Sequence, residues 1–223
     1  SEKGSYYASL GALVDPGWTV QSKVNRYTAL FNTSQKIFKD YVNLNIIGNA
    51  SYRQQRAPGS LSSDVNAATG SVKRDFDINP YSYALRTSRT LDPNEFYTSN
   101  YAPFNIKHEL ANNYIDLSVL DTKFQAELKA RPCKGLELSA LGSVRYQLSN
   151  TEHNIKDSSN QAEAYRAAMT KMIQNANPFL YKDPDKPTSD KYTVLPQGGI
   201  LRKNSYSALS LDFRAWATYN TII

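Results

Sequence analysis

Long segments of strict apolar–polar alternation constrain the fold of this chain more than any other feature of its sequence. From Ser5 to Val14 the even positions are apolar and the odd positions are mostly small or polar. A repeat of two residues places successive side chains on opposite faces of a β-strand. The segment is therefore predicted to be a strand with one apolar face and one more polar face.

The same alternation returns in five further segments. They comprise residues 24–35, 42–53, 114–130, 136–147 and 209–220. In the segment 42–53, for example, Leu44 and Ile46 alternate with asparagines. Several of these segments are at least twice as long as a common strand of about 5–6 residues. The sequence thus predicts an all-β antiparallel chain with about six long strands.

The connections between these segments alternate between short and very long. Short links fall at Lys36–Asp40 and at Arg131–Gly135, whereas the alternation is absent from about Gln55 to Asn112 and again after Gln147. The second long interruption contains SNQAEAYRAAMTKMIQ. Because this stretch is rich in Ala, Gln, Met and Lys, it predicts one loop helix of about four turns over Ser159–Asn175.

Two architectures accommodate long two-faced strands. In a soluble β-sandwich the apolar face packs on a second sheet, and the loops at both ends are usually of comparable length. In an outer-membrane β-barrel the apolar face contacts lipid, the polar face lines the interior, and short periplasmic turns alternate with long extracellular loops. The unequal connections and the asparagine ladder favour the transmembrane barrel. Six strands are too few to close one, since about eight is the smallest common number, so we expect a segment of a wider barrel of about 22 strands.

Composition excludes several other classes of protein. The net charge is +6, but the Lys and Arg residues are scattered and form no basic run that would indicate nucleic-acid binding. The two histidines and the single cysteine form no metal, redox or catalytic motif, so we expect no enzyme, no cofactor and no metal site. No stretch approaches the roughly 18 consecutive apolar residues of a membrane-spanning helix. The first residues do not resemble a signal peptide and the last ones end within a predicted strand, so we interpret the chain as a piece of a longer protein.

Several segments that follow one another in order carry a family resemblance. They are NPYSYALRTSRTL (79–91), NYAPFNIKHELANNYIDLSVLDTKFQAEL (100–128), SALGSVRYQ (139–147), SNQAEAYRAAM (159–169) and VLPQGGI (194–200). Together they resemble the barrel region of the SusC/RagA family of TonB-linked outer-membrane transporters of Bacteroidetes. The resemblance covers most of the chain.

This resemblance implies a role in nutrient import across the bacterial cell outer membrane, by binding and gated passage and without catalysis. A SusD-like surface lipoprotein would lid the barrel, and TonB would energise it through regions outside this chain. The substrate would be an oligosaccharide or an oligopeptide. Residues 1–223 would belong to a single TonB-dependent transporter barrel domain, with the remaining barrel strands, the plug domain and both chain ends outside this sequence.

The irregular segment from Asp77 to Asn105 carries the first candidate site. It is rich in tyrosine, phenylalanine and proline but has no helical or strand period. Its aromatic side chains can stack on sugar rings, or they can pack against other loops or the lipoprotein partner; we favour packing, because large aromatics gain much from burial and are enriched at interfaces. The candidate contact residues are Tyr81, Tyr83, Arg86, Phe96, Tyr97 and Tyr101.

The polar faces of the strands predict a second set of residues, which line the barrel interior. These candidates are Asn43, Asn45, Asn49, Arg53, Arg145, Asp212 and Arg214. On or near the apolar faces, a set of tyrosines fits the aromatic girdles that barrels place at the membrane interfaces. These are Tyr6, Tyr27, Tyr52, Tyr146 and Tyr219.

Four weaker features have simple structural interpretations. Asp183, Asp185 and Asp190 could supply oxygen ligands for calcium, but they lack the spacing of a calcium loop and more closely fit a solvated turn. His108 and Glu109 are too few for a metal site. Cys133 is predicted to lie in an exposed periplasmic turn, and the predicted loop helix to pack on a neighbouring loop through Ala162, Tyr165, Met169 and Met172.

A soluble β-sandwich that binds carbohydrate through aromatic loops remains the alternative. It predicts that these residues fold cooperatively in water by themselves. The polar ladder of residues 42–53 argues against it, because a sandwich would bury one of its two faces against a second sheet.

Overall fold

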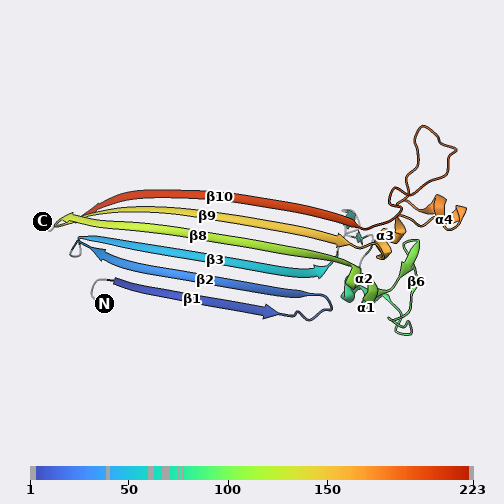
Figure 1. The fold of residues 1–223 in the computed structure, drawn as a ribbon, viewed down its shortest axis with the longest axis horizontal. Helices are drawn as coiled ribbons and strands as arrows, with labels where there is room; N and C mark the ends of the chain where they lie inside the picture. The colour runs from blue at the N-terminus through green and yellow to red at the C-terminus, as the bar shows by residue number, and fades with distance from the viewer. Residues whose placement is uncertain are drawn as a thin grey trace.

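Six long strands form one antiparallel sheet in the computed structural model of the chain, which describes residues 4–38, 41–59, 63–66, 71–74, 76 and 78–220. The strands are β1 (Gly4–Asp15), β2 (Lys23–Ile37), β3 (Val42–Pro58), β8 (Asn113–Cys133), β9 (Leu136–Ile155) and β10 (Ile200–Tyr219). Their order in the sheet follows their order in the chain, so each strand pairs with the long strand that precedes it (Figure 1). Strands β1 and β10 are the two edges and do not pair with each other in the described part of the chain.

The prediction of an all-β chain with six long antiparallel strands is confirmed. The strands are longer than the alternation indicated: β8 has 21 residues, and β9 and β10 have 20 each. Strand β10 begins at Ile200, nine residues before the predicted segment, and β9 continues to Ile155. The added residues are mostly polar on both faces of the sheet, and a period of two is visible only where one face is apolar.

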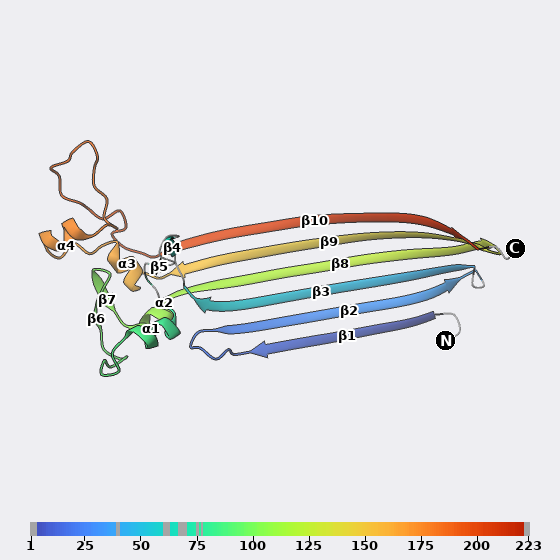
Figure 2. The same cartoon turned by 180° about the vertical axis from the view of Figure 1, so that it is seen from behind.

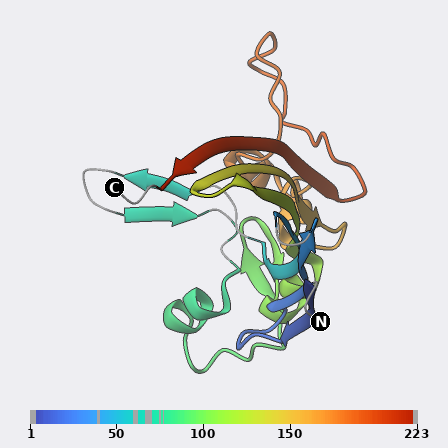
Figure 3. The ribbon, with the colours of Figure 1, turned by 90° about the vertical axis from the view of Figure 1, so that its left-hand side faces the viewer.

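The short and the long connections lie at opposite ends of the sheet. The links from β2 to β3 and from β8 to β9 are at the end that also holds both chain termini, which faces the viewer in Figure 3. The described residues between β3 and β8, and residues 156–199, lie at the other end (Figure 2). At the turn between β8 and β9, Gly135 has a φ of 84°, a left-handed conformation that glycine adopts without a steric penalty.

The long connections fold into small elements that we call the loop cap, comprising residues 78–112 and 156–199. The first part contains α1 (Pro80–Arg86), the β6–β7 hairpin (Tyr97–Ser99 and Ala102–Phe104) and α2 (Ile106–Asn112). Between β3 and α1 lies another short hairpin, β4–β5 (Ser63–Asn66 and Ser71–Arg74). Most of the fully buried apolar side chains belong to the loop cap. The large apolar side chains of the sheet, in contrast, are mostly exposed.

The prediction of one helix over Ser159–Asn175 is wrong. The segment forms two short helices, α3 (Asn160–Ala164) and α4 (Lys171–Ala176). The buried Asn177 side chain donates to the carbonyls of Ala164 at 2.7 Å and Ala167 at 3.1 Å, so these carbonyls have partners outside a continuous helix. Thr170 then caps α4, since its hydroxyl accepts a hydrogen bond from the backbone N–H of Ile173.

Of the four side chains through which that helix was predicted to pack, only two are packed. Ala162 is fully buried, and the Tyr165 ring lies 5.4 Å from that of Phe179. Met169 and Met172, in contrast, are more than four-fifths exposed. The break between α3 and α4 ends the helical spacing that would have placed all four side chains on one face.

Candidate functional site

The pairing register gives the sheet one consistently apolar face. Each member of the central row is the cross-strand neighbour of the next. This row is Ala8, Phe31, Gly48, Phe124, Val144 and Leu211. Side chains that are apolar or small, with the exception of Gln35, continue on the same face from the row of Tyr27 and Tyr52 to the row of Val42 and Leu138, and no charged residue falls between these rows. We call this region the apolar band.

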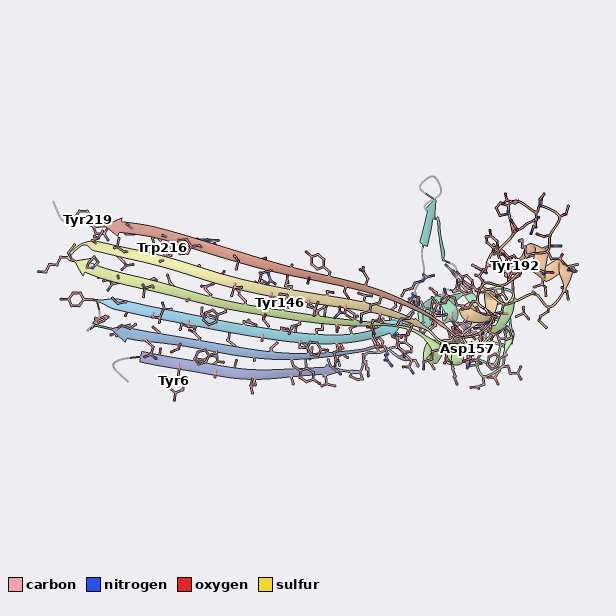
Figure 4. All side chains as sticks on the ribbon, turned by 45° about the horizontal axis from the view of Figure 1, so that its top comes forward. Tyr6, Tyr146, Asp157, Tyr192, Trp216 and Tyr219 are labelled. Atoms are coloured by element: carbon pink, nitrogen blue, oxygen red, sulfur yellow. The ribbon has the colours of Figure 1, made fainter. Side chains whose placement is uncertain are left out.

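The height of the apolar band is that of a membrane-spanning region. Along β3 it runs from Val42 to Tyr52, about 33 Å at roughly 3.3 Å per residue. A strand tilted by about 40° projects this length onto about 25 Å, the height of the apolar band of an outer-membrane barrel. Many of its side chains are exposed, among them Leu10 at 89% and Leu211 at 76%. Side chains along the whole sheet, including Tyr146 and Tyr219, are drawn in Figure 4.

A charged row crosses the same face beyond the apolar band, toward the loop cap. Its members are cross-strand neighbours on five strands: Lys23, Arg56, Asp116, Glu152 and Lys203. Arg56 forms two hydrogen bonds of 2.7 Å with the Asp116 carboxylate, and Lys203 lies 2.7 Å from Glu152. The intervening row is uncharged and contains Gln54 and Asn150. This face therefore changes from apolar to charged within two rows.

All seven residues predicted to line an interior lie on the opposite, polar face of the sheet. Alternation along each strand, combined with the pairing register, places Asn43, Asn45, Asn49 and Arg53 of β3 on the same side as Arg145 of β9. Asp212 and Arg214 of β10 lie on this side too. That this side encloses a lumen stays a prediction.

Ion pairs and hydrogen bonds connect side chains across the polar face. The guanidinium of Arg145 donates to both oxygens of Asp121, at 2.9 and 2.6 Å, and Gln147 donates to the same carboxylate. Asn45 donates to Glu127 at 3.2 Å, and Arg214 pairs with Asp212 on its own strand. This face offers alternating hydrogen-bond donors and acceptors over several strands, as a hydrated surface does.

The predicted aromatic contact residues divide into packed and exposed side chains. Tyr83 and Tyr97 are partly buried against a cluster formed by Ile78, Phe104, Ile106 and Leu110. The Tyr97 and Phe104 rings meet edge to face, with centroids 5.3 Å apart. Burial raises the pKa of the Tyr97 hydroxyl. These two tyrosines are therefore structural parts of the loop cap.

Tyr101 joins the first long connection to the second. It lies in the turn of the β6–β7 hairpin, where Asn100 and Tyr101 both have positive φ angles of 52° and 67°. Such angles are usual for glycine or asparagine in a two-residue turn and uncommon for a bulky residue. The Tyr101 ring centroid lies 6.4 Å from that of Phe179 in the second connection, so the unusual backbone is combined with a contact between the two loops.

The other predicted contact residues are exposed. Tyr81 and Arg86 are on α1. The Phe96 ring is exposed and meets the imidazole of His108 edge to face, with ring centroids 5.5 Å apart. Tyr81 shares a hollow of about 600 Å³ with Trp18, which is 97% exposed. The sequence signal at Trp18 was its DPGW turn, which gave no indication that this side chain would lie beside α1.

A buried polar cluster that the sequence did not predict joins the loop cap to the sheet. Asn113, at the start of β8, donates to the carboxylate of Glu109 at 3.1 Å and to the side-chain oxygen of Gln161 at 3.0 Å. Its own side-chain oxygen lies 2.7 Å from Nε2 of His153. Because an amide oxygen only accepts hydrogen bonds, this nitrogen of His153 is the donor.

Glu109 and Asn160 connect this cluster to the β6–β7 hairpin. The Asn160 backbone N–H donates to Glu109 at 2.6 Å, and the Asn160 side chain donates to the carbonyls of Ser99, Ala102 and Pro103. Glu109 is 1% exposed. Burial raises the pKa of its carboxyl group, and the hydrogen bonds that it accepts act in the opposite direction. Each of these groups has a partner, which fixes the loop cap on the ends of β8 and β9.

The weaker candidates are dispersed, and each has a local structural contact or an exposed position. Asp183 accepts a hydrogen bond from the backbone of Asp185, and Asp190 pairs with Lys171, as in a solvated turn. Glu109 faces the buried polar cluster and His108 faces Phe96. Cys133 is exposed at the end of β8. Within the described ranges no group of three or more His, Cys, Asp or Glu side chains is arranged to hold a metal ion.

Comparison with known proteins adds no assignment. No model of a known protein family matches the chain, and no curated protein is significantly similar to it in sequence. In the part of the chain that the structure describes, no helix has both the length and the apolar character needed to cross a membrane. The features that bear on function are therefore the two faces of the sheet and the loop cap.

Proposed function

We propose that this chain forms part of the wall of an outer-membrane β-barrel that imports a nutrient. The observation that carries the proposal is the apolar band, whose limit at the row of Tyr27 and Tyr52 extends over six strands, whose other limit extends over five, and which is followed by a charged row. A surface of this kind exposed to water would promote aggregation, whereas the hydrocarbon core of a bilayer matches it in height and polarity. The polar face would then line the lumen.

Further strands are needed to complete such a barrel. Strands β1 and β10 each have an edge without a strand partner in the described part of the chain, and each unpaired backbone group in lipid costs several kcal/mol. A barrel of about 22 strands with a plugged lumen, as in TonB-dependent transporters, would cover both edges. The strong resemblance of several ordered segments to the SusC/RagA family is the sequence argument for that class.

The loop cap would contribute to the extracellular surface of this importer. There, a SusD-like lipoprotein and an oligosaccharide or oligopeptide substrate would approach the exposed Tyr81, Arg86 and Phe96. Tyr83, Tyr97 and Tyr101 would support this surface from below, because they pack within the cap. TonB would act on the periplasmic side through residues outside this chain.

The alternative of a soluble sandwich requires a second sheet on the apolar face. Among the described residues the two remaining sheets are short two-stranded hairpins, β4–β5 and β6–β7, and the exposed side chains of the apolar band are not covered by either of them. We therefore do not adopt this alternative.

Membrane fractionation of the full-length protein tests the proposal. We expect the protein to remain in the outer-membrane fraction after a carbonate wash and to migrate differently on a gel with and without heating, as folded barrels do. The lumen and substrate parts are tested by measuring uptake of labelled oligosaccharides and oligopeptides in cells with and without the gene. Recovery of a stable, monomeric protein from the soluble fraction would contradict the membrane assignment.

A further inference from the structure

Three hollows on the apolar face share lining residues, and we call them together the groove, which extends over β1, β2, β3, β8 and β9. A polar hollow of about 310 Å³ lies at the charged row, where Lys23, Arg56 and Asp116 line it. Two apolar hollows of about 470 and 700 Å³ lie deeper in the apolar band. Tyr52 lines both the polar hollow and the first apolar one, and Ala29 and Ala50 are among the residues shared by the two apolar hollows. The groove is thus polar at one end and apolar along the rest.

The groove exists because small residues alternate with large ones on neighbouring strands. Its floor includes Ala29, Gly48 and Ala50, and the rings of Phe31 and Phe124 flank Gly48 on β2 and β8. A Cβ atom added to Gly48 would meet no atom within 4 Å, so the space above this glycine is open. Apolar surface of this kind gains free energy from a ligand of complementary shape.

The length of the groove matches one leaflet of a bilayer. Four residues along β3 separate Tyr52 from Gly48, a distance of about 13 Å at roughly 3.3 Å per residue. At the same tilt of about 40° this length projects onto about 10 Å, most of the roughly 12 Å that one leaflet contributes to an apolar band about 25 Å tall. Since Tyr52 lies at the boundary with the polar rows, an acyl chain beside it would extend through the apolar hollows within its own leaflet.

The polar end of the groove holds one cation that is not paired. Arg56 pairs with Asp116, and Glu152, which also lines this hollow, pairs with Lys203, but Lys23 has no ion-pair partner among the described residues. Nearby, Arg56 and Lys156 both lie over the Tyr114 ring, at 4.1 and 5.5 Å from its centroid. Uncompensated cations and amide donors at the end of an apolar groove complement a phosphate group.

We propose that this groove binds one phosphorylated lipid, with its phosphate group beside Lys23 and one acyl chain in the hollows lined by Ala29, Gly48 and Ala50. The inference rests on the proposed function, because it requires the apolar face to lie in a membrane. It goes beyond the proposed function because it assigns a specific site to one lipid molecule, distinct from the lipid that contacts the rest of the apolar band. A protein segment is a poorer occupant, because its backbone groups would have no partners in the apolar hollows.

Two glycines provide a matched test of the acyl-chain position. Gly48 and Gly142 both lie on the apolar face, and neither has an atom within 4 Å of an added Cβ, but Gly142 does not line the groove. The full-length protein is extracted, delipidated in detergent and titrated with phosphatidylglycerol, and binding is followed by native mass spectrometry. We expect Gly48→Leu to weaken saturable binding by about tenfold and Gly142→Leu to change it by less than about twofold.

A second pair of substitutions tests the phosphate position. Lys23 and Arg26 are both on β2 but on opposite faces of the sheet. Lys23→Gln is expected to weaken phosphatidylglycerol binding by about fivefold, which corresponds to the roughly 1 kcal/mol that one cation contributes near anionic lipid. Arg26→Gln, which removes one positive charge from the polar face, is expected to leave binding unchanged. Diacylglycerol, which has the acyl chains but no phosphate, is expected to bind more weakly and to be insensitive to Lys23→Gln.

The outcomes separate this inference from the proposed function. Heat-modifiable migration on a gel first establishes that each variant is folded. Because the side chain of Lys23 is exposed, we expect Lys23→Gln to fold like the wild-type protein. Equal effects of Gly48→Leu and Gly142→Leu, or no saturable binding by a membrane-embedded wild-type protein, would overturn the lipid site and leave the barrel proposal standing. A wild-type protein found in the soluble fraction would overturn both.

Discussion

The side chain of Gln54 donates a hydrogen bond of 3.1 Å to the hydroxyl of Tyr52, and this contact marks the upper limit of the apolar band. The Tyr52 ring belongs to the last apolar row, next to Tyr27 on β2, whereas Gln54 belongs to the first polar row. An aromatic ring with an apolar body and a polar tip suits the boundary between hydrocarbon and water. In the proposed membrane-spanning arrangement, this pair would lie at the membrane interface and the loop cap would lie outside the hydrocarbon core.

Arginine substitutions on neighbouring residues of β10 distinguish its two faces. Leu211 lies in the central row of the apolar band, and Ser210 lies on the polar face. We expect Leu211→Arg to lower the free energy of unfolding in lipid vesicles by about 2–4 kcal/mol, the cost of an arginine at the bilayer midplane. The penalty for Ser210→Arg should be much smaller. The pair Leu44→Arg and Asn45→Arg on β3 repeats the comparison, and equal penalties on both faces would contradict the assignment.

An alanine at Gly59 is expected to loosen the loop cap. The added Cβ would overlap the side-chain oxygen of Asn113 and lie 2.8 Å from Nε2 of His153, and both of these residues are buried. Overpacking of this kind costs about 1–3 kcal/mol. The expected result of Gly59→Ala is faster proteolysis within residues 78–112.

Gly48→Ala is the control for this experiment, because an added Cβ meets no atom there. If Gly59→Ala and Gly48→Ala were cleaved at the same rate, the buried polar cluster would not be what holds the loop cap on the sheet.

The loop cap should become less stable as the pH rises through the titration of Glu109. Burial raises the pKa of this carboxyl group in the folded chain above the value of about 4.3 for an exposed glutamate. The folded cap therefore binds the proton more tightly than the unfolded cap. Stability is greatest below about pH 4.3 and falls until the pH passes the raised pKa. Hydrogen exchange of α2 measured over this range should show protection decreasing with pH.

Glu109→Gln removes the titrating group, so exchange of α2 in this variant should lose most of its pH dependence in the same window. Glu163, which is at the surface of α3, provides the control, since Glu163→Gln should leave the pH dependence unchanged. A wild-type profile that is flat, or one that rises with pH, would show that the burial of Glu109 does not control its titration.

Asn177 is expected to be essential for the break between α3 and α4. It is fully buried and donates to the carbonyls of Ala164 and Ala167, so Asn177→Ala removes both of these buried hydrogen bonds at a cost of about 1–3 kcal/mol. Asn177→Asp should be worse, because it places a carboxylate against two carbonyl oxygens. Hydrogen exchange over residues 160–176 measures the effect. Asn175→Ala, at an exposed position nearby, should be neutral. Comparable exchange in all three variants would contradict the role of Asn177 in the break between α3 and α4.

The sequence was sufficient to predict the six long strands because the polarity of the side chains differs between their two faces. It also placed Asn45, Arg145 and Asp212 on a common polar face, since a period of two fixes the side of every residue once a strand is identified. The ends of β9 and β10 were missed, because near Glu152 and Lys203 both faces are polar and the alternation disappears.

The loop cap was less predictable, because its structure depends on contacts between residues far apart in the sequence. The interaction of Asn113 with Gln161 joins the start of β8 to the second long connection, and no local pattern contains it. The single helix predicted over Ser159–Asn175 followed from intrinsic propensity, which the side chain of Asn177 overrides by binding carbonyls at its centre. Trp18 and Tyr81 come together for the same reason, through the packing of separate loops.

Spin-label accessibility along β10 in the membrane-embedded, full-length protein tests the central claim most directly. Single labels at positions 209 to 214 are compared for collision with oxygen, which concentrates in the hydrocarbon, and with a water-soluble nickel chelate. The account predicts that labels replacing Leu209, Leu211 and Phe213 favour oxygen, and that labels replacing Ser210, Asp212 and Arg214 favour the chelate. Accessibility without this alternation, or apolar-face labels shielded from both reagents as in a sandwich core, would contradict the assignment of the apolar band to lipid.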